Sequence, residues 1–319
     1  IMMAGCSGNN PGDALDFVNP FIGTDGHGHT FPGASMPFGM VQLSPDTRKD
    51  NWDACSGYHY SDSSIFGFSH THLSGTGVGD YGDVRIMPMT GGLRIKPGTD
   101  QVPGYRSHFS HQDEHASPGY YRVLLKDYGI KAEMTTTSRC GMHQYTFPKS
   151  DEAYIIIDLT ESVVTENITE LSVNIINDHD ISGYRRSSGW ADDQIIYFYA
   201  SFSEPFTGFG IASDGQISPD SVVATGKDIQ AFVRYSTEKN SKIMVKVGLS
   251  AVSADGARKN LEQEIPGWDF GLIREQAEES WRKELGRIEV KGGKHEDKIK
   301  FYSALYHCYL VPNLFSDID

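Results

Sequence analysis

This sequence of 319 residues has few cysteines, few basic residues and no long apolar run. Four cysteines as widely spaced as Cys6, Cys55, Cys140 and Cys308 make neither a disulfide scaffold nor a zinc-binding pattern. Lys and Arg number 28 against 42 Asp and Glu, and the net charge of −14 disfavours binding to nucleic acid and to anionic lipid. No apolar stretch is long enough to cross a membrane. A neutral ligand remains compatible with this composition.

Glycine, tyrosine and phenylalanine are abundant, with 34, 16 and 16 residues, which is typical of aromatic-rich strands joined by turns. From position 120 onward, short β-branched and aromatic segments alternate with turn signals such as Ser213-Asp214-Gly215. We expect strands at 120–125, 130–137, 142–147, 154–159, 172–176, 194–202, 208–212, 230–235 and 242–247. Many short strands with no helices between them predict a mainly β fold, an antiparallel β-sandwich.

The hydrophobic period changes after Pro266-Gly267. An apolar stripe at helical spacing predicts an amphipathic helix that Gly286 ends, and it consists of Phe270, Ile273, Ala277, Trp281 and Leu285. A second helix, from about Glu296 to Pro312, is apolar on much of its surface and is therefore expected to be buried. We predict a β-sandwich domain over 13–265, a helical linker over 266–293, and the first helix of a largely absent helical domain over 294–319.

The first residues resemble the end of a bacterial lipoprotein signal. Ala4 and Gly5 run into Cys6, and a polar stretch follows, as in signals whose cysteine is lipidated after cleavage. We expect 1–12 to be a signal remnant and tether. Cys6 would then anchor the protein to a membrane by lipid alone, in the periplasm or at the cell surface of a bacterium. The alternative is a chance cysteine near a terminus.

Residues 13–90 are dense in Gly, Pro, His and Asp, which indicates a long loop region with a function. One interpretation is a metal site, because two His-x-His pairs could each present both imidazoles to one ion. The candidate ligands are His27, His29, His70, His72, Asp80 and Asp83. Glycine beside the histidines weakens the strand geometry that this site needs. A hydrogen-bonded polar cleft explains the same residues.

A sugar pocket is the other interpretation of these loops. Ser56 and Ser74 lack the Gly-x-Ser-x-Gly context of a nucleophile, and the glycines at 75–79 lack the spacing of a nucleotide loop. A sugar pocket combines an aromatic platform with short polar side chains that fix hydroxyl groups. The residues of this kind are Trp52, Asp53, Tyr58, His59, His72 and Asp80.

Long motifs run along the chain from Val18. They include Val18-Asn19-Pro20-Phe21-Ile22-Gly23-Thr24, Phe31-Pro32-Gly33-Ala34, Ser56-Gly57-Tyr58-His59-Tyr60, Gly67-Phe68-Ser69-His70-Thr71-His72, Ser182-Gly183-Tyr184-Arg185-Arg186 and Phe301-Tyr302-Ser303-Ala304-Leu305-Tyr306-His307. In this order they strongly resemble the N-terminal domain of the α-mannosidases of glycoside hydrolase family 92, and Phe301 onward resembles the start of the catalytic domain. The match covers essentially the whole chain from Val18, so chance agreement is implausible.

The resemblance implies an exo-acting, inverting, calcium-dependent enzyme that releases mannose from α-mannosides such as N-glycans. The β-sandwich would pack on its own C-terminal (α/α)6 barrel, with the substrate between them. The general acid, the general base and the calcium ligands would come from that barrel, and inversion uses two separated carboxyl groups. Because the chain stops at Asp319, just after the first barrel helix, we expect these groups beyond it and the fragment alone to be inactive.

The resemblance also assigns residues. Trp52, in Trp-Asp-x-Cys-Ser-Gly-Tyr, matches the family position that lines the leaving-group subsite. Further substrate contacts are expected at Cys55, Ser56, Tyr58, His59, His70, His72 and Asp80, whose alternative role is to hold the loop in shape. No catalytic residue or metal ligand is expected within the chain. Two other functions stay open: a non-catalytic carbohydrate-binding surface lipoprotein, and a metal-dependent hydrolase that uses the His-x-His pairs.

Overall fold

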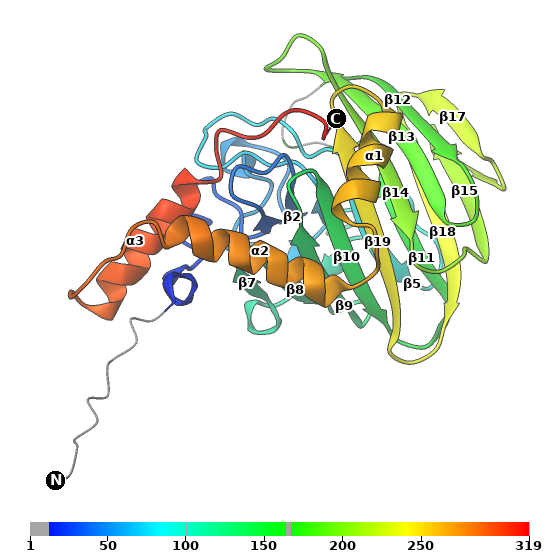
Figure 1. Ribbon diagram of the computed structural model, residues 1–319. Coiled ribbons are helices and arrows are strands. Elements are labelled where there is room, and N and C mark those ends of the chain that lie inside the picture. The colour runs from blue at the N-terminus through cyan, green and yellow to red at the C-terminus, as the bar shows by residue number, and fades with distance from the viewer. Residues whose placement is uncertain (1–12, 100, 162, 164–166, 319) are drawn as a thin grey trace.

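The computed structural model of the protein describes residues 13–99, 101–161, 163 and 167–318. Two large antiparallel sheets dominate it (Figure 1). A small additional sheet pairs β3 (Ser64–Ile65) with β6 (Ser107–His108). In spatial order the first sheet contains β1 (Ala34–Ser35), β2 (Gln42–Asp46), β4 (Gly67–Ser69), β5 (Arg85–Thr90), β11 (Ser150–Asp158), β18 (Ile229–Thr237), β15 (Gly208–Ser213) and β16 (Gln216–Pro219). The second contains β17 (Val223–Gly226), β12 (Asn167–Ile175), β13 (Asp180–Ser188), β14 (Gln194–Phe202), β19 (Ser241–Ser250), β10 (Cys140–Phe147), β9 (Ile130–Thr136), β8 (Tyr120–Leu125) and β7 (His115–Ser117).

The core lies between these two sheets, as the predicted antiparallel sandwich requires. Strand residues alternate between faces, so every second side chain points inward. β14 shows this alternation, with Ile196 and Phe198 buried. In β11, Ile155, Ile156 and Ile157 are all buried, so both faces of this central strand are covered. The mainly β fold class is therefore confirmed, and each of the nine strands expected from position 120 onward overlaps a strand of the structure.

The two longest strands of the sandwich without a sequence prediction are β5 and β13. β5 contains Pro88, and β13 contains Gly183 and several serines, all of which are poor strand signals. β13 nevertheless pairs along its length with both β12 and β14, and β5 pairs with β11 over six residues. Pairing with neighbouring strands therefore overrides local preference at these two positions.

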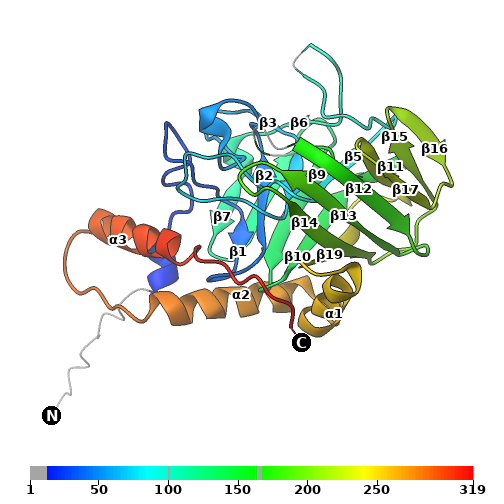
Figure 2. The same ribbon diagram turned by 90° about the horizontal axis from the view of Figure 1, so that it is seen from above.

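The helices are η1 (Ala14–Phe17), η2 (Trp52–Ala54), η3 (His111–Asp113), α1 (Ala254–Glu264), α2 (Phe270–Leu285) and α3 (His295–Cys308). α1 and α2 pack on the outer face of the nine-stranded sheet, as Figure 2 shows. α2 buries the predicted apolar stripe and ends at Gly286, whose N–H donates to the carbonyl of Arg282. The sequence analysis therefore identified this helix and the face that it buries.

α1 was not predicted, and it lies within the range 13–265 assigned to the β-sandwich. Ser253 caps it, but only Ala257 and Leu261 bury apolar side chains, so no long apolar stripe marks the segment. The helix lies close to β19 at Gly248, where a Cβ atom would come within 2.2 Å of the Ala257 carbonyl oxygen.

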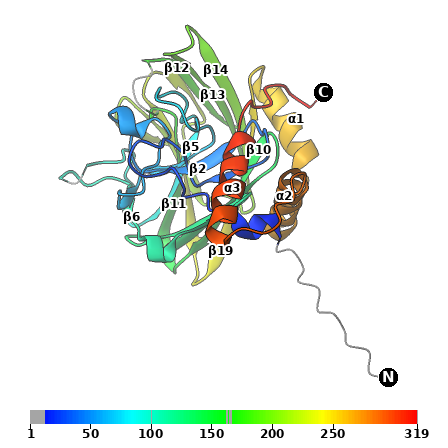
Figure 3. The same ribbon diagram turned by 90° about the vertical axis from the view of Figure 1, so that its left-hand side faces the viewer.

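α3 is buried on one face only, whereas its apolar sequence predicts burial on most of its surface. The ring of Tyr306 packs at a tilt against Trp281 of α2, with centroids 4.5 Å apart, and the ring of Tyr302 stacks on Phe17 of η1, with centroids 5.7 Å apart. Figure 3 shows η1 lying between α2 and α3. Phe301, on another face, is 37% exposed. No helix among the described residues is both long and apolar enough to span a bilayer, and Cys6 lies outside the described residues.

Candidate functional site

Three loop segments, 23–30, 47–62 and 70–83, are tied together by backbone hydrogen bonds. Tyr60 N–H donates to the carbonyl of Thr24 at 2.8 Å, and Gly75 N–H donates to the carbonyl of His29 at 2.7 Å. Asn51 precedes η2 with a φ of 75° and accepts from the N–H of Asp53 through its side chain. This local turn projects Trp52 outward from the loops.

Trp52 is fixed in position and still open to solvent. Its indole Nε1 donates to the carbonyl of Gly77 at 3.0 Å, and the ring of His29 meets it edge-on at 4.3 Å. Gly77 allows this approach, because a Cβ atom there would lie 2.8 Å from the indole nitrogen. The side chain nevertheless remains 53% exposed. Such a fixed, open aromatic face is what a sugar ring stacks on.

A carboxylate lies directly beside this indole. Asp53 Oδ1 is 2.6 Å from His27 Nδ1 and 3.7 Å from Nε2 of the buried His29. The hydrogen bond from His27 lowers the pKa of Asp53, so the group is ionised and accepts hydrogen bonds at neutral pH. His27 and His29 entered the sequence analysis as metal candidates, and the structure places both around Trp52 instead.

The predicted site residue His72 lies in the interior. Its Nδ1 donates to the carbonyl of Gln42 at 2.8 Å, and its Nε2 lies 3.0 Å from Asp46 Oδ1. Arg85 Nε donates to the other oxygen of Asp46 at 2.9 Å. Burial opposes the charge on Asp46, but Arg85 and His72 outweigh burial and lower its pKa. This ionic cluster ties β2 to β5 and to the loop after β4.

His70 belongs to a second buried chain of polar groups. Its Nδ1 donates to the carbonyl of Val84 at 2.7 Å, and its Nε2 lies 3.0 Å from Nε2 of His143. The hydroxyl of Tyr145 lies 2.8 Å from His143 Nδ1. Two neutral imidazoles satisfy every contact if Tyr145 donates to His143 and His143 donates to His70. Burial lowers the pKa of His70 to about 4 and that of His143 well below its usual value.

The other predicted substrate contacts also have partners within the protein. The Tyr58 hydroxyl donates to the buried carboxylate of Glu114, and the Ser56 hydroxyl donates to the carbonyl of Tyr58. His59 Nε2 donates to the carbonyl of Gly26 at 3.1 Å. Cys55 and Asp80 are buried, and the Asp80 side chain accepts from the N–H of Tyr81. Burial raises the pKa of the Cys55 thiol. Trp52 is the predicted residue that offers an open face.

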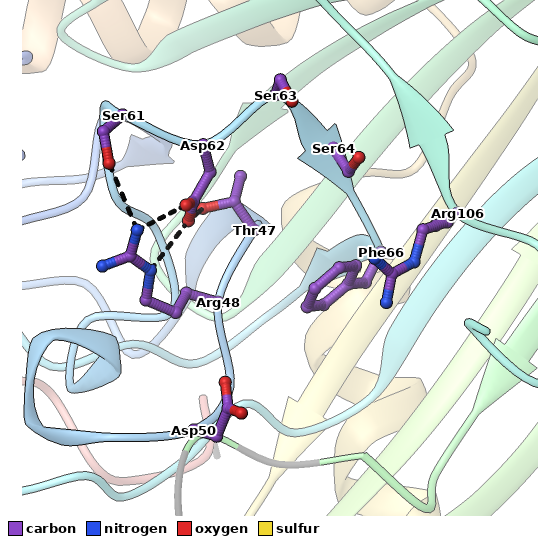
Figure 4. A pocket seen from close by; sticks show the side chains of 9 residues that line it. All are labelled: Thr47, Arg48, Asp50, Ser61, Asp62, Ser63, Ser64, Phe66 and Arg106. Atoms are coloured by element: carbon purple, nitrogen blue, oxygen red, sulfur yellow. Dashed lines mark hydrogen bonds and ion pairs between the residues drawn. The ribbon is translucent and has the colours of Figure 1, made fainter. Parts of the chain in front are cut away.

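A small polar pocket of about 280 Å³ lies next to this loop, and no residue in it was singled out from the sequence. Figure 4 shows the Arg48 guanidinium turned toward Asp62, to which Nε donates at 3.1 Å. Across the pocket, the Arg106 guanidinium lies 4.6 Å from the centroid of the Phe66 ring. Asp50, two residues before Trp52, also lines it. Most of this pocket is therefore built by the loop segment 47–62, which also carries Trp52, and by the residues that follow it.

Within the described residues, no group of three or more His, Cys, Asp and Glu side chains is placed to hold a metal ion. The pair His70 and His72 does not converge on one point, because their ring nitrogens contact separate protein groups. The described part of the chain therefore does not form the zinc site that the His-x-His pairs suggested. It also does not form a complete calcium site of protein carboxylates.

Two known domain families match the sequence of this chain. The glycosyl hydrolase family 92 N-terminal domain matches residues 17–250, and the glycosyl hydrolase family 92 catalytic domain matches residues 256–319. The chain belongs to glycosyl hydrolase family 92. The family resemblance of the motifs is thereby confirmed.

Solved and curated members of family 92 are similar over nearly the whole chain. An α-mannosidase from Bacteroides thetaiotaomicron, in complex with mannoimidazole, is 42% identical with a TM-score of 0.92, over 96% of this chain and 41% of its own. An inverting mannosidase from the same organism is 28% identical with a TM-score of 0.85, over 98% of this chain and 41% of its own. An uncharacterized secreted glycosidase from Arthroderma benhamiae is 29% identical, over 98% of this chain and 43% of its own. The chain therefore spans less than half the length of each.

Proposed function

We propose that this chain is the N-terminal part of an inverting, calcium-dependent exo-α-mannosidase that acts on α-mannosides such as N-glycans. Its membership of family 92 and its 42% identity to an α-mannosidase support the reaction class. The observation that carries the role of this part is Trp52, because it combines 53% exposure with a fixed indole. The chain would supply a sugar-binding face and leave bond cleavage to other residues.

The chemistry of the Trp52 face suits the leaving-group side of a mannoside. One face of the indole can stack on the C–H groups of a sugar ring. The ionised carboxylate of Asp53 can accept hydrogen bonds from hydroxyl groups at the edge of that ring. His27 and His29 orient both groups. Binding here would orient the scissile bond rather than break it.

Inversion needs a general acid and a general base whose carboxyl groups lie roughly 6.5–9.5 Å apart, leaving room for a water. Three buried carboxylates near the Trp52 loops, Asp46, Asp83 and Glu114, are bound to Arg, His, Thr or Tyr side chains of the same chain. They are therefore poor candidates for either role. We propose that the acid, the base and the calcium ligands lie outside the described residues, in a barrel against which this part packs.

The test is sugar release by the complete enzyme that contains this chain. We expect it to hydrolyse methyl α-mannoside or α-mannobiose with β-mannose as the first product seen by NMR. Activity should be lost with a calcium chelator and return when calcium is added. α-Mannose as the first product would contradict inversion, full activity in the chelator would contradict the calcium requirement, and no mannose release would contradict the function itself.

We also propose export and lipid anchoring through Cys6. The description of the Arthroderma benhamiae relative as secreted supports export alone. The anchor predicts that the natural protein partitions into detergent and carries a diacylglycerol mass on Cys6. A Cys6→Ala variant found in the soluble fraction, with activity retained, would agree with the anchor. A wild-type protein without the lipid mass would contradict it.

A further inference from the structure

A second pocket lies where the turn between β12 and β13, the end of β14 and the loop between α1 and α2 meet. Its volume is about 480 Å³, within the range of roughly 300–1,000 Å³ typical of small-molecule sites. Its walls come from residues 177–180, 201–203 and Trp268. None of these belongs to the loops that hold Trp52, so the two surfaces are built from separate parts of the chain.

Trp268 provides a fixed aromatic wall in this pocket. The ammonium of Lys246 lies 4.3 Å from the centroid of its ring and also donates to the carbonyl of Ile265 at 2.9 Å. A cation over an aromatic face is attractive and limits rotation of the ring. Trp268 is half-buried and packs against the apolar cluster under α1 and α2. The indole is therefore positioned before any ligand arrives.

The polar wall opposite is also positioned in advance. The side-chain oxygen of Asn177 accepts from the N–H groups of His179 and Asp180 at 2.7 and 2.8 Å, which fixes the turn. His179 Nδ1 donates to the carbonyl of Phe202 at 2.8 Å, so the neutral ring presents Nε2 as an acceptor. The Ser203 hydroxyl oxygen accepts from the N–H of Met244 at 3.0 Å. These contacts hold short polar side chains in a fixed shape.

The charges around the pocket favour a neutral ligand. Asp178 and Asp180 line it and would repel an anion. The buried ammonium of Lys246 behind Trp268 interacts with Asp180 and offsets part of this negative charge. A ligand with many hydroxyl groups and an apolar C–H face is compatible with both walls, because it can accept, donate and stack at once.

We propose that this pocket binds one neutral sugar residue, stacked on Trp268 and hydrogen-bonded by Asp178, His179 and the serines 201 and 203. It is a second carbohydrate site, separate from the Trp52 face. The proposal does not depend on the mannosidase activity, because it rests on the pocket of this chain alone. A second site of this kind would hold a glycan on the enzyme between successive cleavages at its end.

Fluorine NMR of the chain labelled with fluorotryptophan tests the two surfaces at once, because the sequence has four tryptophans, Trp52, Trp190, Trp268 and Trp281. Substitution of each by Phe assigns the signals. Trp281 is fully buried and serves as the internal reference. On titration with methyl α-mannoside we expect the Trp268 signal to shift saturably while the Trp281 signal stays in place. The Trp52 signal reports independently on the proposed leaving-group subsite.

Asp178→Ala should weaken the affinity for methyl α-mannoside, read from the Trp268 titration, about tenfold. This is the effect of removing one charge-assisted hydrogen bond. Asp192→Ala, an exposed aspartate on another turn, is the matched control and should leave the response unchanged. An unmoved Trp268 signal, or equal responses in both variants, would overturn the second site. A response of Trp52 without Trp268 would overturn it and leave the proposed function standing.

Discussion

At the scale of single residues, Trp52 and the histidines around it differ in what the fold leaves accessible. Trp52 is open, His29 is buried against its edge, and His70 is fully enclosed. An open residue such as Trp52 can contact a ligand, whereas an enclosed residue such as His70 affects the stability of the fold. Two predictions separate these roles.

Trp52→Ala should lower kcat/KM of the complete enzyme on α-mannosides by about tenfold or more, because a stacked aromatic ring contributes up to about 1.5 kcal/mol beyond its area. The unfolding midpoint should change little, since the side chain is 53% exposed. Trp52→Phe should recover part of the loss. Steady-state kinetics beside urea unfolding measures both, and an unchanged kcat/KM would remove Trp52 from the site.

The buried histidine pair should make stability depend on pH. The pKa of His70 falls from 6.5 to about 4 on folding, so between these values the unfolded chain binds a proton that the native state excludes. The contribution of His70 to the free energy of unfolding is therefore fully present above pH 6.5 and declines as pH falls toward 4. The loss for this residue is on the order of 2 kcal/mol at about pH 5.

Urea unfolding at several pH values measures this slope. Replacement of both His70 and His143 by Gln should flatten it between pH 6.5 and 4, even if overall stability is lower. A slope that survives the double replacement would contradict the assignment to this pair.

At the scale of elements, the loops of the site depend on close packing at glycine. Gly57 has a φ of 75°, and a Cβ atom there would lie 2.7 Å from Asp46 Oδ1 and 2.9 Å from the His72 ring. Both side chains are locked in a buried ionic cluster and cannot move aside cheaply. Gly215, in the turn between β15 and β16, has a φ of 76° and nothing within 4 Å of its Cβ position.

These two glycines form a matched pair for mutation. Gly215→Ala should destabilise the protein by about 1–2 kcal/mol, which is the backbone cost of a left-handed alanine. Gly57→Ala should cost about 1–3 kcal/mol more, because it adds overpacking to that strain. Thermal or urea unfolding compares them, and equal losses would show that the contact with Asp46 and His72 has no energetic weight.

At the scale of the whole molecule, Trp281 connects the sandwich to its helices. It is fully buried in α2, its Nε1 donates to the carbonyl of Ser35 in β1 at 2.6 Å, and its ring packs at a tilt against Tyr306 of α3. One side chain of α2 thus contacts both α3 and β1, which lies 246 positions earlier in the chain. The helices and the sandwich should therefore unfold together.

Trp281→Ala should lower the free energy of unfolding by about 3–5 kcal/mol, the usual cost of a large cavity in a core. Trp281→Phe should lose less, because one aromatic ring remains, although the hydrogen bond to Ser35 and part of the buried ring volume are lost. Urea unfolding followed by circular dichroism measures both variants. A separate early transition of the helices, with the sheets intact, would contradict a single cooperative unit.

The 319 residues by themselves should release no mannose and bind no stoichiometric calcium, because no described cluster of side chains is placed to hold a metal. Assay of the isolated chain beside the complete enzyme, with calorimetry for calcium, tests this. Turnover by the chain alone at the rate of the complete enzyme would show that it contains its own acid and base.

The sequence alone determined the features that depend on neighbours along the chain. Period-two segments predicted strands of the sandwich, the stripe from Phe270 to Leu285 predicted α2, and the family motifs pointed to Trp52. These signals are local, because side-chain direction repeats every two residues in a strand and every 3.6 in a helix. α1 was not predicted, because two buried apolar residues, Ala257 and Leu261, are too few to make an apolar stripe.

Tertiary structure alone decided which of the motif residues face solvent and which contact one another. His70 meets His143 across 73 positions of the chain, and Asp46 meets Arg85 across 39. Likewise, Trp268 closes a pocket with the distant turn at 177–180. The sequence shows residue types, but burial and partners depend on how strands from different parts of the chain stack. His70 and His72, which spacing alone allowed as metal ligands, are for that reason internal supports of the fold.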